Sequence, residues 1–153
     1  MGFDEVWEDV RNIANRTGQF CWDGEGHFTA AVHDRFREIP QPSFGVYVVR
    51  VKRGRGGRRG QVLYVGKAGA VANAGGFRGT QGLEMRLCNT RHGDSNANQW
   101  AQELQLEQQP NGLLIEYAVL QDPRVMSPAL AEARLLQAYL EQHGRLPAEN
   151  RQL

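Results

Sequence analysis

The chain has 153 residues, the length of one compact domain, which indicates a single domain spanning residues 1–153. Hydrophobic residues make up 41% and charged residues 23%, a balance that supplies one core and argues against wholesale disorder. The net charge of +1 does not by itself indicate a polyanionic partner, and no stretch approaches the ~20 apolar residues of a membrane helix.

The basic residues are distributed unevenly along the chain. The stretch from Arg50 to His92 holds ten basic residues and one acid, Glu84, whereas the remainder has eight basic residues and sixteen acids. The ten are Arg50, Lys52, Arg53, Arg55, Arg58, Arg59, Lys67, Arg78, Arg86 and Arg91. A local excess of this kind steers and holds phosphate groups even when the total charge nearly cancels.

Residues 1–42 form an N-terminal extension. The apolar positions from Asp4 to Arg16 repeat with helical spacing, which predicts a helix. Segments 19–22 and 27–33 flank a Gly-rich turn at 23–26 and favour a hairpin. Pro40 and Pro42 then mark a break in the chain.

The start of the chain is acidic and lacks the basic and apolar regions of a signal peptide, so we expect a cytoplasmic protein. Cys21 and Cys88 have neither the spacing of a metal site nor that of a disulfide scaffold. We therefore expect two buried free thiols.

The central part of the chain reads as a hairpin. Segments 44–51 and 62–65 are rich in β-branched and aromatic residues, and the loop between them, 52–60, combines glycines with arginines. These features predict two antiparallel strands joined by a basic tip. Residues 66–82 are Gly-rich and read as irregular.

Helices and one more strand follow. Helical spacing extends from Leu83 to about residue 91 and again over 96–108, whereas 113–120 alternates as a third strand does. Ser127 before Pro128 is a helix start, and Gly144 predicts the end of that helix after His143.

Five elements in this order resemble the GIY-YIG endonuclease domain. They are Gly45-Val46-Tyr47, Tyr64-Val65-Gly66-Lys67, a helix with Arg86, a helix with Ala131-Glu132-Ala133, and Asn150. The resemblance covers residues 43–153 and implies an α/β fold with a small three-stranded antiparallel sheet flanked by helices. The helix and hairpin of residues 1–42 extend that core. The strands and helices read from the residues have the same order, and this agreement supports the assignment.

The resemblance implies a metal-dependent endonuclease that hydrolyses DNA phosphodiester bonds, on branched or specific sites. Glu132 is the expected ligand for Mg²⁺ or Mn²⁺, since magnesium often takes one or two carboxylates and keeps several waters. Arg86 is expected to face the scissile phosphate with its bidentate donors, and Lys67 to contact the same phosphate. Arg78 is a rival for the role of Arg86, because the interval before Arg86 is longer than is usual in the family.

Tyr47 and Tyr64 are expected to lie near each other across the hairpin and to handle the attacking water. A phenol has a pKa near 10, so a tyrosine base needs a nearby cation. We favour Tyr47 as the base and Tyr64 as the positioning group, and the sequence leaves that choice open. Further contacts to DNA are expected from Asn150 and from the basic residues Arg55, Arg58, Arg59 and Arg91.

The alternative function is a catalytically inactive nucleic-acid-binding module that uses the basic loop at 50–59. Glu132 discriminates between the two, because a protein that only binds DNA has no need for a carboxylate that faces a phosphate site.

Overall fold

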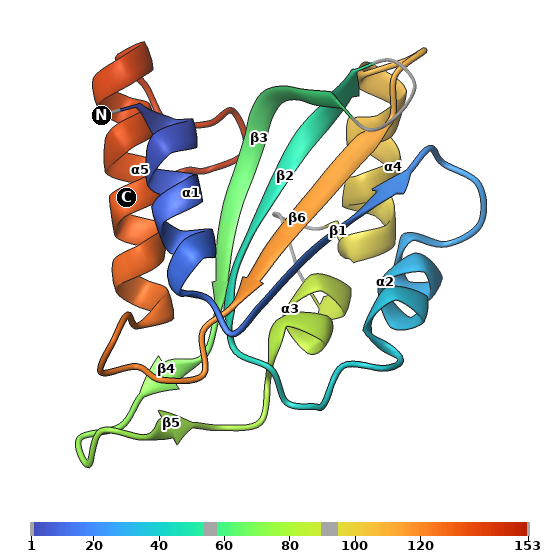
Figure 1. The fold of residues 1–153 in the computed structure, drawn as a ribbon. Helices are drawn as coiled ribbons and strands as arrows, with labels where there is room; N and C mark the ends of the chain where they lie inside the picture. Colours follow the sequence, from blue (N-terminus) through green and yellow to red (C-terminus); the bar gives the residue numbers. More distant parts are fainter. Residues whose placement is uncertain (1, 54–57, 90–94, 153) are drawn as a thin grey trace.

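The computed structural model describes residues 2–53, 58–89 and 95–152 and contains a mixed α/β fold in three layers. The middle layer is an antiparallel sheet in the order β1-β6-β2-β3 (Figure 1). Its strands are β1 (Arg16–Trp22), β2 (Gly45–Arg53), β3 (Arg58–Ala68) and β6 (Leu113–Val119). The predicted α/β class, with an antiparallel sheet flanked by helices, is confirmed.

Two helices, α1 (Phe3–Ile13) and α5 (Pro128–His143), cover one face of the sheet (Figure 1). Ser127 caps α5 by accepting a hydrogen bond from the Leu130 backbone, and Gly144 ends it in the left-handed conformation. These are the bounds that the sequence predicts. The apolar stripes of both helices pack on the alternate sheet residues Val46, Val48 and Ala118.

Three helices, α2 (Phe28–Phe36), α3 (Leu83–Asn89) and α4 (Ala97–Glu107), cover the opposite face (Figure 1). Asn96 caps α4 through a hydrogen bond from the Gln99 backbone. The inward residues of these helices pack on Tyr47, Val49 and Tyr117 of the sheet. The sheet therefore has a hydrophobic core on each side.

The N-terminal extension differs from its prediction. Residues 28–33 belong to α2 and not to a strand, with His27 as the N-cap, because Phe28, Val32 and Phe36 recur every four residues and are all buried. The first helix ends at Ile13, because Arg16 already pairs with Val119. That pairing makes β1 a fourth strand of the sheet, where the sequence predicts three.

Alternation along β1 also corrects the prediction of two buried thiols. Both cysteines are free, but Cys21 is exposed and Cys88 is half-buried. Cys21 occupies an outward-facing position of an edge strand, whereas the next residue, Trp22, points inward.

Residues 66–82 are more regular than predicted. They contain a small separate hairpin of β4 (Ala70–Val71) and β5 (Phe77–Arg78), which projects beyond the end of the main sheet (Figure 1). The Phe77 ring stacks on Phe44 with a centroid distance of 4.3 Å. This stack fixes the hairpin to the residue that precedes β2.

The C-terminal tail lies along β3, which is an edge strand. The Glu149 backbone donates to the Leu63 carbonyl, and the Asn150 side chain bonds both to the Val65 backbone N–H and to its carbonyl. Exposed sheet edges invite pairing with other chains, and this tail covers part of the edge. Among the described helices, none has the length and apolarity that crossing a membrane requires.

Candidate functional site

The two tyrosines of the tripeptides lie together beside the edge strand. Tyr47 pairs with Gly66 across β2 and β3, so Tyr64 is its diagonal neighbour on the same sheet face. Their ring centroids are 6.0 Å apart, and a hydrogen bond joins the two hydroxyls. Trp100 of α4 meets Tyr64 edge to face at 5.5 Å. The expected proximity of the two tyrosines is present.

The two glycines of the tripeptides are required by close packing. A Cβ added at Gly66 would lie 2.3 Å from Cζ of Tyr47, so the ring rests directly on the glycine backbone. A Cβ added at Gly45 would lie 1.9 Å from the Ala118 carbonyl oxygen on the neighbouring strand. Both glycines therefore let a neighbouring group approach closer than any side chain would permit.

Arg86 reaches the site from α3. The start of this helix is tied to the sheet, because the Leu83 backbone N–H donates to the Ser43 carbonyl at 2.7 Å, two residues before β2. Leu83 and Leu87 are buried against the core, and Arg86 is exposed on the helix surface. The helix thereby presents the guanidinium to solvent at a fixed place beside the hairpin.

Glu132 reaches the site from α5 on the other face. Glu132 is half-buried. The adjacent residue Ala131 and the i+4 residue Leu136 are buried, so Glu132 lies at the border of the helix face that packs on the sheet. Lys67 pairs with Val46, whose side chain faces α5, and so emerges on the same face as Glu132. Because β3 is an edge strand, side chains from both faces can approach one another around it.

Electrostatics connect these groups. Burial raises the pKa of the Glu132 carboxyl, and the charges of Lys67 and Arg86 oppose that rise. Burial also raises the pKa of Tyr64, and the Glu132 carboxylate adds to the rise. The hydrogen bond with Tyr47 and the charge of Arg86 act in the opposite direction. Each of the five residues expected at the centre of the site therefore interacts with at least one of the others, and Glu132 and Tyr64 link the set.

A basic pocket opens next to this cluster. It has a volume of about 690 Å³. Its lining residues come from the end of β3, the small hairpin and the start of α3: Lys67, Gly69, Ala70, Arg78, Gly79, Thr80, Gln81 and Arg86. The lining contains three cations and no acid, so it favours an anion. Arg78 and Arg86, rivals in the sequence, line one pocket together.

Other predicted contacts lie elsewhere. Asn150 uses both polar groups of its side chain on the Val65 backbone, so the structure places it as a clamp on β3. Arg59 lies eight residues before Lys67 on the same strand, about 25 Å away at strand spacing. Its guanidinium donates to the Glu116 and Glu8 carboxylates, on the side of the sheet that α1 covers.

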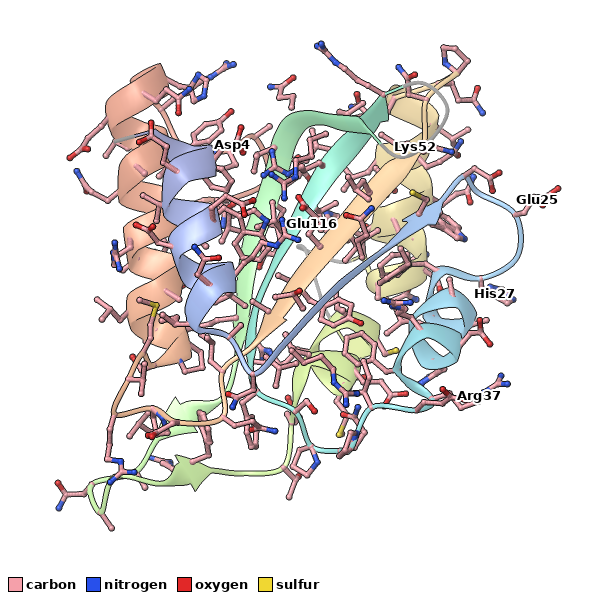
Figure 2. All side chains as sticks on the ribbon, viewed as in Figure 1. Asp4, Glu25, His27, Arg37, Lys52 and Glu116 are labelled. Carbon is pink, nitrogen blue, oxygen red and sulfur yellow. The ribbon has the colours of Figure 1, made fainter. Side chains whose placement is uncertain are left out.

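Three further arginines are predicted to contact DNA. Arg55 and Arg91 lie outside the described residues, and Arg58 begins β3 with only its backbone described. Lys52 marks the β2–β3 end of the sheet, opposite the β4–β5 hairpin (Figure 2). Lys52 and the pocket thus lie at opposite ends of the β2–β3 pair.

Sequence reasoning did not identify Thr80, Gln81 or the role of Phe77. The first two line the pocket, and the third anchors the hairpin that carries Arg78. The signal available in the sequence is the run from Gly66 to Leu83, which contains no acid while it carries Lys67 and Arg78.

Comparisons of the chain with protein-family models, with curated proteins and with solved structures find no match.

Proposed function

We propose that the chain is a metal-dependent nuclease of the GIY-YIG type that hydrolyses phosphodiester bonds in DNA. The observation that carries the proposal is the convergence of Glu132, Lys67, Arg86 and two tyrosines at one end of β3, beside a pocket lined by cations. A cluster of ion pairs that only stabilises the fold needs no basic pocket beside it. A site that cleaves a phosphodiester needs one, because it must bind the negatively charged phosphate.

The residues fit a magnesium-type ion held by Glu132. Mg²⁺ commonly takes one or two carboxylates and keeps most of its waters, which suits a single half-buried carboxylate that interacts with two cations of the pocket, Lys67 and Arg86. In the described part of the chain, no group of three or more His, Cys, Asp and Glu side chains forms a closed cage for a metal. When bound, a divalent cation supplies charge stabilisation to the phosphate and to the leaving oxygen.

Arg86 and Lys67 hold and neutralise the phosphate. The guanidinium of Arg86 offers two parallel N–H donors to phosphate oxygens, and Lys67 adds a point charge from the end of β3 in the same pocket. Both cations also act electrostatically on Glu132, so the candidate metal ligand and the phosphate share the same positive charges. Preorganised charges of this kind provide much of the catalysis in phosphoryl chemistry.

Tyr64 positions the attacking water. It is the more exposed of the two tyrosines, and its raised pKa keeps the hydroxyl protonated at neutral pH, able to hydrogen-bond. Tyr47 is only 2% exposed and is hydrogen-bonded behind Tyr64. Through that hydrogen bond Tyr47 acts as the base in its phenolate form: Tyr64 passes its own proton to Tyr47 as it takes the proton of the water, so that both tyrosines end protonated and Tyr64 remains the positioning group.

The test is cleavage of supercoiled and branched DNA with Mg²⁺ by the wild type, Glu132→Gln and Glu141→Gln. Glu141 is an exposed acid on the same helix and serves as the matched control. We expect Glu132→Gln to lose at least about 100-fold in rate, as is typical for removing a charge-stabilising group, and the control to retain its rate. Equal rates for all three refute the metal assignment. A wild type that binds DNA but cleaves neither DNA nor RNA points to the binding module.

A further inference from the structure

The basic pocket receives its cations from three separate elements. Lys67 ends β3, Arg78 belongs to β5 and Arg86 belongs to α3. One bidentate arginine and one lysine are enough to bind and neutralise a single phosphate. A third cation in the same pocket, with no acid in the lining, indicates more negative charge in the ligand than one phosphate carries.

Arg78 is distinct from the other two cations in its surroundings. Burial raises the pKa of Glu132 and the charges of Lys67 and Arg86 oppose that rise, whereas Arg78 is not among the charges that act on Glu132 or Tyr64. Its side chain is exposed, and it forms no ion pair with any acid in residues 2–53, 58–89 or 95–152. Arg78 is therefore a cation of the pocket that no described acid pairs with.

The small hairpin holds Arg78 in place. Phe77 stacks on Phe44, and successive side chains of a strand point to opposite faces, so Arg78 points away from that stack. Ala70, the residue paired with Arg78, also lines the pocket. A small partner opposite the arginine leaves room for a ligand above the hairpin.

We propose that Arg78 binds a phosphate next to the one held by Arg86 and Lys67. The inference rests on the proposed function and deepens it: the substrate is a polynucleotide strand with successive phosphates, and a compound with one isolated phosphodiester lacks the second contact. Arg78 is then a substrate-positioning residue, and Arg86 acts on the scissile phosphate.

The salt dependence of DNA binding tests this proposal. Each phosphate neutralised on duplex DNA contributes about 0.9 to the slope of log Kd against log salt concentration. Fluorescence anisotropy with a labelled duplex in EDTA measures binding without cleavage. We expect Arg78→Ala and Arg86→Ala each to reduce the slope by about 0.9, and the double variant by about twice that amount.

Two control variants separate charge from folding. Arg78→Lys keeps the charge and is expected to retain the wild-type slope. Arg37→Ala removes an exposed arginine near the end of α2, outside the pocket, and is expected to leave the slope unchanged (Figure 2).

The outcomes distinguish the two proposals. An unchanged slope in Arg78→Ala, with a reduced slope in Arg86→Ala, overturns the second phosphate contact and leaves the nuclease proposal standing. A double variant whose slope equals that of either single variant shows that both arginines hold one phosphate, which also overturns the inference. A duplex that binds the wild type and Arg86→Ala with the same slope contradicts the proposed function itself.

Discussion

Replacement of Glu116 tests whether the arginines of the β2–β3 hairpin belong to the fold. Glu116 lies on β6 beneath α1 and is 2% exposed (Figure 2). Its carboxylate accepts hydrogen bonds from Arg50, from Arg59 at 2.9 Å and from the Trp7 indole at 3.2 Å. Three donors on one buried carboxylate form a network that requires its charge.

The size of the effect follows from what the substitution leaves behind. Glu116→Gln keeps the volume and removes the charge. Among the described residues, the ion-pair partner left to Arg50, whose side chain is 3% exposed, is then Asp4, whose side chain is 66% exposed. An exposed partner contributes little, and a buried charge deprived of its partner typically costs about 3–5 kcal/mol. We expect a loss of about 3 kcal/mol in the free energy of unfolding, equivalent to a Tm lower by roughly 6–12 °C at this chain length.

Urea unfolding followed by tryptophan fluorescence measures the loss, with an unchanged m-value as the sign that compactness is preserved. The control is the double variant Arg50→Met with Glu116→Leu, because replacing both charges of a buried pair by apolar groups is often neutral. We expect the double variant to be more stable than Glu116→Gln. A loss below about 1 kcal/mol in Glu116→Gln, or a double variant less stable than the single one, refutes the reasoning.

Two further predictions concern β3. Asn150→Ala removes both hydrogen bonds to the Val65 backbone, and we expect urea unfolding to show a loss of about 2 kcal/mol in the free energy of unfolding. The dependence of DNA binding on salt concentration is expected to be unchanged. A reduced dependence would show that Asn150 contacts DNA. Gly66→Ala forces the Tyr47 ring to move, and we expect a loss of stability of about 1–3 kcal/mol together with loss of DNA cleavage. Gly76→Ala, at a glycine with open space around it, is the control, and equal cleavage by both variants would contradict the role of the Tyr47 position.

The sequence correctly predicts helix ends that are set by the residues next to them. Ser127, Pro128 and Gly144 bound α5 through capping and backbone conformation, which act within a few residues. The same reasoning is wrong for residues 27–33, because a short apolar segment beside a turn suits a strand or a helix equally well. The spacing of Phe28, Val32 and Phe36 resolves the question only when the segment is extended past residue 33.

Contacts between distant segments explain why two arginines of the predicted DNA-binding surface form ion pairs within the fold instead. Arg50 and Arg59 count as basic surface in the sequence, but Glu116, their shared partner, follows them by 66 and 57 residues. Likewise, β1 joins the sheet only by pairing with β6, about a hundred residues later. The order of motifs along the sequence predicts the candidate site residues. Ion pairs between distant segments then determine which basic side chains remain available to bind phosphate.

The edge position of β3 links the stability of the fold to the candidate site. Val65 follows Tyr64, lies two residues before Lys67 and points into the core beneath α5, so the strand conformation around it sets the directions of both side chains. Asn150 accepts a hydrogen bond from the Val65 N–H and donates one to the Val65 carbonyl. It thereby makes the two backbone hydrogen bonds that a further strand would make at this edge. The tail thus closes the edge beside the tyrosines and leaves its Lys67 end open to the basic pocket. On this argument Asn150 supports the site through β3, without touching the substrate.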